Sequence, residues 1–595
     1  MSKLVNYPCA LPIATIPQDI DASSIAEQFT KELDSLNSHH FLKDAIWRDI
    51  FALTGTLRTF HSASSVSAAW NETSKRAKVH SFELDPTSAR VVRLPQGSAW
   101  IEARFSFQTD AVPSMLCSAI VLLVPGSDGQ WLVWVLRTVL DQLKGQPNVD
   151  VLQKVESSAK LSNGHVNGNR NGNGVQTHFD CVVIGGGLAG LSTGGRLKAL
   201  GVSYVVLDKY KNVGDNWKLR YGSARLHTNR EYGHLPFERT FGPEYEEYLN
   251  KDDLAKGYAE WAKKFDINIW LETNVISGSW DSSRELWTLN IRQGGNERSI
   301  TSAFVVLAGG AGGHVPVLPP PYKDREVFEG VTMHSAEYTT AAEWRGKHGV
   351  VVGTANTAHD VAEDMVEAGL ASITMIQRSK TYVLPAEYYL KVASLSYNAA
   401  KPTEEADRAT LTTPYAVVEL MSRVTLNDMA SKEPERFDAL EKAGFKTERY
   451  GNIQEHILVR LGGHYMDVGA SKKIADGLIK VKSDALPVRY VKDGLIFSDG
   501  THLKADIIVF ATGFEGNMRQ QVEQLFGSEI GAQVGDFWGL DEEGELKAAF
   551  KPTGHPAIWL HGGTIGLGRY FSRFIALQIK AKLLGTPLPL YEKTA

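Results

Sequence analysis

Cysteine is scarce in this chain. Its 595 residues contain three, Cys9, Cys117 and Cys181, and these lie far apart in the sequence. That spacing excludes a disulfide framework, a Cys-x-x-Cys redox pair and a cysteine-ligated zinc site. Since free thiols persist in reducing compartments, we expect a cytoplasmic protein.

Long apolar runs and an excess of basic charge are also missing. No stretch of about 18 apolar residues suggests a membrane span, and the N-terminus lacks the basic-then-apolar order of a secretory signal. Sixty-three Lys and Arg against 68 Asp and Glu give a formal net charge of -5. This balance argues against general binding to nucleic acid or to anionic membranes. No cluster of side chains has metal-ligand spacing, so no metal site is expected.

The length of the chain requires several folding units, because 595 residues exceed what one hydrophobic core can serve. The clearest boundary is "SSAKLSNGHVNGNRNGNGVQTH", residues 157–178. Its repeated Asn-Gly pairs and near absence of apolar side chains predict a flexible linker. Residues 1–156 therefore form a unit of their own.

The pattern of residues 1–156 predicts a small α+β domain, since a helix is followed by several strands. Ser24 and Glu27 suggest a capping box at the start of the helix. One helical face would carry Ile25, Phe29, Leu33 and Leu36. "IEARFSF" alternates apolar and polar residues, and "AIVLLV" and "WLVWVL" flank "PGSDGQ" as the two strands of a hairpin.

A complete βαβ dinucleotide-binding fingerprint occupies residues 179–210. The apolar strand "CVVI" enters the turn "GGGLAG", a helix follows, and a second strand ends in an acid. The glycines permit the sharp turn, the approach of a pyrophosphate and close helix packing, and the helix N-terminus receives the phosphates. The acid accepts hydrogen bonds from a ribose hydroxyl and repels a 2′-phosphate, which leaves FAD or NAD. The expected binding residues are Gly185, Gly187, Leu188, Ala189, Gly190, Asp208 and Lys209.

A second turn, "VVVGTANTAHD" at residues 350–360, keeps one glycine and carries alanine at the other two positions. Alanine adds one methyl group, which a slightly wider turn accepts, and the helix N-terminus is retained. The following strand delivers Arg378 in place of an acid. A guanidinium there suits the 2′-phosphate of NADPH. The expected binding residues are Gly353, Thr354, Asn356, Thr357, Arg378 and Ser379.

The residues between and after the turns carry a resemblance. In "FEGVTMHSAEY", Phe328, Gly330, His334 and Tyr338 match the F-x-G-x-x-x-H-x-x-x-[Y/W] signature of the flavin-containing monooxygenase superfamily. The segment "NVGDNWKLRYGSARLHT", residues 212–228, resembles the one that wraps the flavin in these enzymes, and this assigns FAD to the first turn. The late strand "IIVFATGF", residues 507–514, is similar to their "ATG" strand.

The resemblance covers residues 179–595 and implies further site residues. It assigns cofactor contacts to Trp217, Arg220, His227, Thr228, Thr512 and Gly513. His334 would couple NADPH binding to domain movement, and Asn229 aligns with a catalytic asparagine near the reacting flavin. Residues 1–156 resemble a nuclear-transport-factor-like (SnoaL-type) cone domain fused ahead of fungal enzymes of this kind. Such a domain binds or dimerises more often than it catalyses.

The predicted fold class is α/β, with two Rossmann-like dinucleotide domains preceded by the cone-like domain. The FAD domain would span 179–335 and 501–595, and the NADPH and substrate domain 336–500. The resemblance implies insertion of one oxygen atom from dioxygen into a small organic substrate through a C4a-(hydro)peroxyflavin. N- or S-oxygenation in secondary metabolism or detoxification is favoured. Tyr338–Thr339 at the end of the signature disfavours a Baeyer–Villiger enzyme.

Some alternatives to this interpretation stay open, and one is set aside. Baeyer–Villiger insertion or oxidative decarboxylation remains possible, and so does a flavin-binding scaffold that no longer turns over. A homodimer through the N-terminal domain is also possible. A disulfide-reductase-type flavoprotein needs a redox cysteine pair, which this chain lacks.

Overall fold

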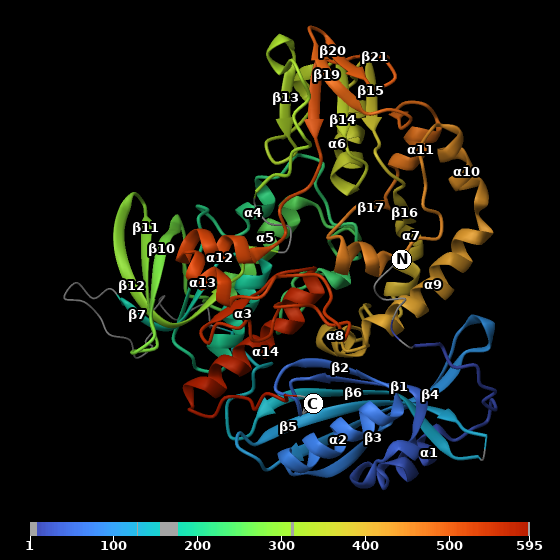
Figure 1. The fold of residues 1–595 in the computed structure, drawn as a ribbon, viewed down its shortest axis with the longest axis vertical. Helices are drawn as coiled ribbons and strands as arrows, with labels where there is room; N and C mark the ends of the chain where they lie inside the picture. The colour runs from blue at the N-terminus through green and yellow to red at the C-terminus, as the bar shows by residue number, and fades with distance from the viewer. Residues whose placement is uncertain (1–6, 8, 128, 155–175, 311–314, 593–595) are drawn as a thin grey trace.

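The computed structural model describes residue 7 and residues 9–127, 129–154, 176–310 and 315–592. Three sheet-based parts are visible in Figure 1. The N-terminal sheet lies at the bottom, a seven-stranded sheet at the left and a five-stranded parallel sheet at the top. The predicted α/β class with two Rossmann-type sheets is confirmed. Most of the predicted linker, residues 157–175, falls outside the described residues, and its last residue already begins a strand.

The N-terminal part is a strongly bent six-stranded sheet in the order β2-β1-β6-β5-β4-β3. Only β1 and β6 pair in parallel. The predicted hairpin is present, with Pro125 opposite Trp131, and β4 buries alternate residues as its pattern required. The elements are α1 (Ala22–Thr30), β1 (Phe41–Ile50), β2 (Leu57–His61), α2 (Ala63–Ala77), β3 (Val79–Arg93), β4 (Ala99–Thr109), β5 (Met115–Pro125) and β6 (Trp131–Leu143).

The predicted capping box at Ser24 and Glu27 is wrong. Helix α1 begins at Ala22, two residues before Ser24. The Asp21 side chain is its N-cap and accepts hydrogen bonds from the amides of Ser23 and Ser24. The helix ends at Thr30, so Leu33 and Leu36 are buried by the turn that follows it. An aspartate at the N-cap satisfies the same orphan amides, and this makes the later serine an ordinary helical residue.

The seven-stranded sheet contains the first Rossmann unit. Its order is β10-β11-β12-β7-β8-β9, and β23 also pairs with β12. The parallel pairs are β12–β7, β7–β8, β8–β9 and β12–β23. The antiparallel pairs β10–β11 and β11–β12 extend the sheet on one side. The elements are β7 (His178–Ile184), α3 (Leu188–Ala199), β8 (Tyr204–Leu207), α4 (Asp215–Lys218), α5 (Lys251–Lys264), β9 (Ile269–Trp270), β10 (Thr273–Asp281), β11 (Leu286–Gln293), β12 (Asn296–Leu307), β23 (Ile558–Leu560) and α14 (Ile565–Leu583).

The five-stranded sheet is the second Rossmann unit, in the order β13-β22-β14-β15-β18, with every pair parallel. A three-stranded antiparallel sheet, β19-β20-β21, lies beside it. The elements are β13 (Val331–His334), β14 (His348–Val352), α6 (Asn356–Glu367), β15 (Ser372–Ile376), α11 (Ala470–Ala475), β18 (Lys480–Lys482), β19 (Pro487–Val491), β20 (Gly494–Phe497), β21 (His502–Lys504) and β22 (Ile507–Phe510).

The structure corrects where the chain passes between these two units. Strand β13 pairs with β22, and both belong to the second sheet. Residues 331–334 therefore leave the first unit before the predicted boundary at 335. Residues 507–510 still belong to the second unit, although we expected a return to the FAD domain from 501 onward. The return follows β22, through α12 (Met518–Phe526) and α13 (Ser528–Gln533).

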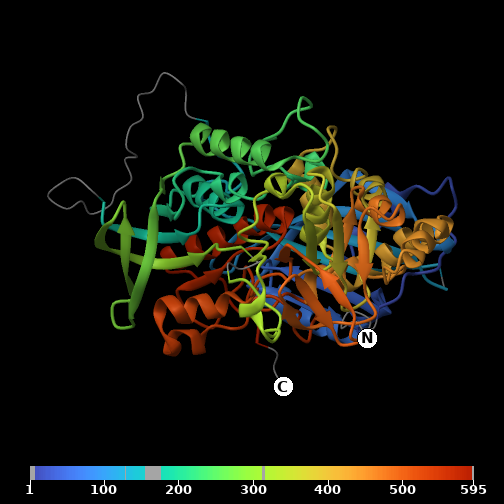
Figure 2. The ribbon, with the colours of Figure 1, turned by 90° about the horizontal axis from the view of Figure 1, so that it is seen from above.

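A helical segment connects the second unit to the rest of the molecule. It comprises β16 (Tyr382–Pro385), α7 (Ala386–Ala393), α8 (Thr403–Leu411), α9 (Tyr415–Lys432), α10 (Pro434–Lys442) and β17 (His464–Asp467). In Figure 1, α8 and α9 descend from the second unit to the N-terminal sheet. In Figure 2, seen from above, the blue N-terminal part lies mainly behind the yellow and orange segments of the second unit and the helical segment.

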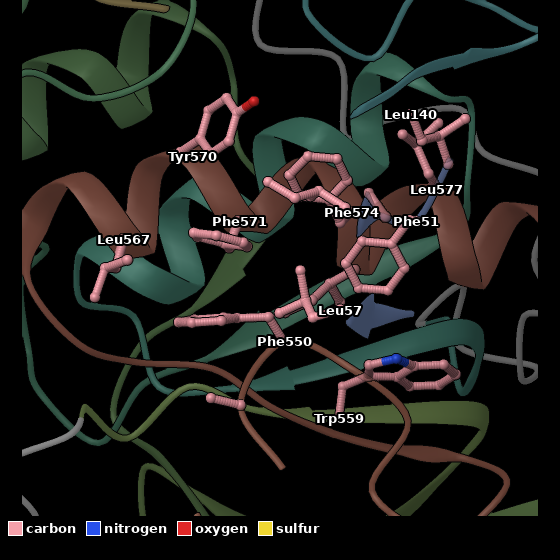
Figure 3. Packing of buried hydrophobic residues seen from close by; sticks show 14 of the residues in the cluster. Phe51, Leu57, Leu140, Phe550, Trp559, Leu567, Tyr570, Phe571, Phe574 and Leu577 are labelled. Atoms are coloured by element: carbon pink, nitrogen blue, oxygen red, sulfur yellow. The ribbon is translucent and has the colours of Figure 1, made fainter. Parts of the chain in front are cut away.

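Helix α14 runs through the middle of the molecule. Every residue from Gly566 to Ile579 is buried. Figure 3 shows why: Phe574 stacks on Phe51 of the N-terminal part, with ring centroids 5.2 Å apart, while Phe571 stacks on Phe550. The helix therefore packs against both the N-terminal part and the first Rossmann unit within one continuous core. No helix within the described residues is long and apolar enough to cross a membrane.

Candidate nucleotide-binding site

The first glycine turn joins β7 to α3. Gly185 has a φ of +112°, and a Cβ there would lie 2.6 Å from the carbonyl oxygen of Ala308. A Cβ on Gly190 would lie 1.8 Å from the carbonyl oxygen of Gly185. Both positions thus require glycine for the fold itself. Gly187 differs, because the atom nearest to its Cβ position is the Asn216 amide nitrogen, at 3.2 Å.

The N-terminus of α3 fits a pyrophosphate. Gly187 is the N-cap, and no side chain caps the helix. The first amides of α3 therefore lack the partner that a capping residue supplies, whereas Asp21, Asn250 and Thr564 cap α1, α5 and α14. Uncapped amides together with the helix dipole bind phosphate oxygens. Leu188 and Ala189 form the first turn of this helix.

Asp208 follows β8 and lies against the same turn. Its carboxylate would meet a Cβ on Gly186 at 2.4 Å, and burial raises its pKa above the ordinary value. Backbone amides around Tyr210 hold the carboxyl in place. A buried carboxylate at this strand end suits the two hydroxyls of a ribose. Lys209 is exposed beside it.

The second glycine turn repeats this geometry between β14 and α6. Gly353 has a φ of +123°, and a Cβ there would lie 2.4 Å from the carbonyl oxygen of Ala511. Ala355 is the N-cap of α6, again without a capping side chain. Ala358 is fully buried against the sheet, so the methyl group at the former glycine position is accommodated. This helix N-terminus also fits a phosphate group.

Arg378 lies two residues beyond the end of β15, exposed together with Ser379 and Lys380. No protein group within the described residues contacts its guanidinium. Other predicted polar groups of this turn already have partners: the Thr354 hydroxyl bonds Thr381 at 2.7 Å, and Asn356 Oδ1 accepts from the Met466 amide at 2.8 Å. These two side chains shape the turn, and Arg378 is the cation that remains available to a ligand.

The segment that follows the first turn contacts the helix of the second. The Tyr221 hydroxyl donates to Asp360 Oδ2 at 2.7 Å, and His227 Nε2 lies 3.3 Å from Asp360 Oδ1. Asp360 is 3% exposed and belongs to α6. One buried carboxylate thus links the flavin-side segment to the helix of the second nucleotide turn. Ligands on the two turns would extend toward the same junction.

Asn229 lies at this junction, 1% exposed. Its Nδ2 donates to the Tyr397 carbonyl at 3.1 Å, while Oδ1 has no partner. The neighbouring Thr228 hydroxyl is also buried without a partner. Burying unpaired polar atoms costs free energy, so such atoms mark a place where a ligand or water supplies the missing bond. The predicted catalytic asparagine is therefore fixed by one end and available at the other.

The other predicted residues make contacts of their own. The Arg220 guanidinium lies 4.3 Å above the Trp217 ring. His334 stacks edge-on against Phe514, its pKa is lowered by burial, and its Nε2 is unpartnered. The Thr512 hydroxyl donates to the Val317 carbonyl, and Gly513 accepts from the Val317 amide at 2.9 Å. These last contacts join two chain segments, and the cofactor role of Thr512 and Gly513 stays a prediction.

Three functional candidates were not expected from the sequence. Asp407 of α8 accepts from both Nε and Nη2 of Arg569 at 2.7 Å, and it accepts from the Tyr397 hydroxyl at 2.9 Å. Arg569 also donates to the carbonyls of Tyr232 and His234. Arg569 is therefore fully paired inside the protein. Tyr465 and Asp467 are also buried, and the Tyr465 ring stacks on His359.

The described residues contain no group of His, Cys, Asp and Glu that could hold a metal. The three cysteines are free thiols, and Cys117 and Cys181 are buried.

Parts of this chain are similar in sequence to known proteins. A family model described as pyridine nucleotide-disulphide oxidoreductase matches residues 182–417. An FAD-containing monooxygenase, EthA, from Mycolicibacterium smegmatis is 27% identical over 371 residues, covering 59% of this chain and 70% of the relative. The indole-3-pyruvate monooxygenase YUCCA8 from Oryza sativa is 27% identical over 399 residues, covering 65% and 84%. Over these residues the chain is similar in sequence to FAD-containing and indole-3-pyruvate monooxygenases.

Solved structures of such monooxygenases are also similar. A flavin-containing monooxygenase from Stenotrophomonas maltophilia matches with 18% identity and a TM-score of 0.47, covering 69% of this chain and all of that one. A cyclohexanone monooxygenase from Rhodococcus bound to NADP+ matches with 16% identity and a TM-score of 0.48, covering 69% and 84%. The match region of the family model begins after the N-terminal sheet.

Proposed function

We propose that this chain is an FAD- and NADPH-dependent monooxygenase that transfers one oxygen atom of dioxygen to a soft nitrogen or sulfur centre of a small organic substrate. The enzyme class and the two cofactors are those of its relatives. The observation that carries the proposal is the Tyr221–Asp360–His227 junction, because it joins the segment after the first nucleotide turn to the helix that follows the second. FAD is held at Gly185–Gly190 and Asp208, and NADPH at Gly353, α6 and Arg378.

When bound, FAD supplies the redox and oxygen chemistry, and NADPH supplies the hydride. The protein contributes orientation and exclusion of water. Asn229 offers an amide oxygen in a buried position, with its nitrogen anchored on Tyr397. A group held in this way can accept a hydrogen bond without reorganisation. Such a preorganised site favours oxygen transfer over release of hydrogen peroxide.

The charge near Asn229 favours an electrophilic oxidation. Attack on a carbonyl requires a negatively charged oxygen donor, and a nearby cation would stabilise that charge. The buried arginine that contacts this loop, Arg569, is neutralised by Asp407 and two carbonyls. Electrophilic transfer to nitrogen or sulfur needs no such cation, so the site suits that reaction better.

A second candidate is oxidation of a 2-oxo acid with loss of carbon dioxide. It is supported by the relatives named indole-3-pyruvate monooxygenases, one of which spans 65% of this chain. The test is to incubate the purified protein with NADPH, dioxygen and a panel of one tertiary amine, one sulfide, one ketone and one 2-oxo acid. A product heavier by one oxygen from the amine or sulfide supports the proposal. Decarboxylation supports the second candidate, and a lactone or ester supports Baeyer–Villiger insertion.

Absence of NADPH consumption with all four substrates and without substrate would instead indicate a flavin-binding scaffold. The pathway, a role in secondary metabolism or detoxification, and residence in the cytoplasm are part of the proposal. We also propose that the N-terminal unit is a SnoaL-like accessory domain. One face of its sheet carries α2 and the other contacts α8 and α9, so a homodimer through this unit would use its edges or helices.

A further inference from the structure

The N-terminal sheet contacts the substrate-side helices through buried arginines. Arg48 of β1 donates from Nη1 to the carbonyls of Leu411 and Thr413 at 2.9 and 2.8 Å. Arg137 of β6 donates from Nη1 to the Ala409 carbonyl at 3.0 Å and to the Thr413 hydroxyl at 2.9 Å. Arg48 and Arg137 are 0% and 2% exposed. Both guanidinium groups therefore face one short segment, residues 409–413.

That segment contains the C-terminal end of α8, and the helix ends at Leu411. The last carbonyls of a helix have no partner inside the helix and must find one outside. Cations at this end also interact favourably with the helix dipole. The usual solution is a glycine or a basic residue of the helix itself. Here the caps come from β1 and β6, more than 260 residues away in sequence.

The contact extends beyond the two caps. Arg408 of α8 pairs with Asp141 at 2.6 Å. Val417 of α9 is fully buried among Ile46, Trp100 and Trp134 of the N-terminal sheet. Arg48 also forms a bidentate ion pair with Glu545, and its guanidinium lies over the Tyr415 ring. The start of α9 and the end of α8 are thus both packed on this sheet, as Figure 1 shows.

Helix α8 in turn holds the loop of Asn229. Its Asp407 binds Arg569, which donates to the carbonyls of Tyr232 and His234 at 2.7 and 2.6 Å. The same carboxylate accepts from the Tyr397 hydroxyl, and the Tyr397 carbonyl accepts from Asn229. Every residue of this chain of contacts is at least nine-tenths buried.

We propose that Arg48 and Arg137 are positioning residues of the active site: by capping α8 they fix Tyr397 and Arg569, and these two fix the Asn229 loop. The N-terminal unit is then a structural part of the site and not a separately acting module. The link to α8 stands on the contacts alone. Its consequence for the reaction rests on the proposed function.

The test compares two arginines of the N-terminal unit. Arg137→Met removes the Arg137 donors to Ala409, Thr412 and Thr413, leaves those of Arg48 in place and keeps the apolar stem. Arg58→Met is the matched control, because Arg58 also joins this unit to the body, through Glu543 and the Tyr591 carbonyl, but contacts nothing in α8. Amide hydrogen exchange is measured on the full-length protein. We expect peptides spanning 403–413 to exchange roughly tenfold faster or more in Arg137→Met, since charge-assisted bonds are lost, and to keep wild-type rates in Arg58→Met.

The second measurement follows the link downstream. Tyr397→Phe removes only the hydroxyl, which is bonded to both Asp407 and Thr410 of α8. Tyr570→Phe is its control, because that buried hydroxyl has no partner. In air with NADPH and no added substrate, we expect Tyr397→Phe and Arg137→Met to release hydrogen peroxide at least twofold faster than wild type and both controls, with the KM for NADPH unchanged.

Unchanged exchange at 403–413 in Arg137→Met, or equal acceleration in Arg58→Met, overturns the proposal. So does a peroxide release by Tyr397→Phe equal to that of Tyr570→Phe. If Arg137→Met does not fold, Thr413→Val replaces it, because it removes one acceptor of Arg137 at nearly constant shape. If the wild-type protein oxidises no NADPH, the proposed function fails, and the exchange comparison alone still decides whether the N-terminal unit holds α8.

Discussion

Two glycines three residues apart in the first turn serve different purposes. Gly190 is required by the fold, because a side chain there would overlap the Gly185 carbonyl. At Gly187 the nearest obstacle is the flexible end of Asn216, so the protein alone tolerates a side chain. The need for glycine at 187 comes from a ligand that approaches the backbone.

The variant Gly187→Val separates these purposes. We expect a folded protein, with a melting temperature within a few degrees of the wild-type apoprotein, that is colourless after purification and takes up no FAD. Gly190→Val should instead fail to accumulate as folded protein, because the turn cannot close. Visible absorption and a thermal melt measure both outcomes. A yellow Gly187→Val protein would remove this turn from the flavin site.

Arg378→Ala tests the assignment of the second turn. Since Arg378 is exposed and has no partner within the described residues, its loss should leave stability unchanged. We expect the KM for NADPH to rise about tenfold or more, and the KM for NADH to change by less than about twofold, because a charge-assisted contact to the 2′-phosphate is lost. Arg489→Ala, an exposed arginine on β19, is the control. Equal effects on both nucleotides would contradict the assignment.

How much of the site is visible in sequence depends on how local each contact is. The glycines and Asp208 fall within 32 residues of one βαβ unit, so spacing alone predicted them. Asn229 and Tyr397 are 168 residues apart, and Asp407 and Arg569 are 162 apart. No periodicity connects such pairs, so the sequence does not show that Arg569 is paired with Asp407. Its actual partners became visible only in three dimensions.

At the scale of elements, α6 connects the two nucleotide turns. Its N-terminus faces the second ligand, and one turn later Asp360 binds the segment that follows the first. The helix can therefore set the distance between the two cofactors as well as hold one of them. The contact is a charge-assisted bond to a buried carboxylate, which is stronger than a neutral one.

Tyr221→Phe weakens this contact and leaves the ring in place. We expect the rate at which NADPH reduces the flavin in an anaerobic stopped-flow experiment to fall by about fivefold to twentyfold, as misplacement of the reacting atoms predicts. The affinity for FAD should not change. Tyr450→Phe, at an exposed tyrosine, controls for the substitution. Reduction at the wild-type rate would show that Asp360 does not set the geometry.

The burial of helix α14 could not be predicted from its sequence. Its sequence alternates apolar residues with Arg569, Ser572, Arg573 and Gln578, which resembles a half-exposed helix. All four polar side chains are buried and bonded, for instance Arg573 to Asp150 at 2.6 Å and Gln578 to the Phe550 carbonyl at 2.9 Å. A helix inside a core can hide polar residues if distant partners satisfy them. The hairpin at 125–131 and the βαβ unit at 179–210, whose signals are local, are present as predicted.

For the whole molecule, burial of neutral histidines predicts a dependence of stability on pH. Burial lowers the pKa of His359, His555 and His561 to about 4. The unfolded chain binds protons at these sites below about pH 6.5, but the folded chain does not. The free energy of unfolding should therefore be fully retained above about pH 6.5. It should fall toward pH 4 by about 1.4 kcal/mol per pH unit for each histidine.

The check is a series of thermal melts between pH 7 and pH 5. We expect the melting temperature to fall steadily, and to fall less steeply in His561→Gln than in wild type. The glutamine can retain a bond to Thr193 or to the Gly568 carbonyl. His39→Gln, at an exposed position, should match the wild-type slope. A flat profile across this range would show that these histidines are not kept neutral by the fold.

The three parts of the molecule meet at one place. The N-terminal sheet caps α8, α8 holds the Asn229 loop, and Asp360 ties that loop to the second Rossmann unit. The N-termini of α3 and α6, each of which follows a glycine turn and has no capping side chain, carry a nucleotide in this account. The most direct measurement is anaerobic addition of NADPH to the purified yellow protein. The account predicts that the visible flavin band bleaches and returns on admission of air, with oxygen consumed. A flavin band that persists with excess NADPH would contradict it.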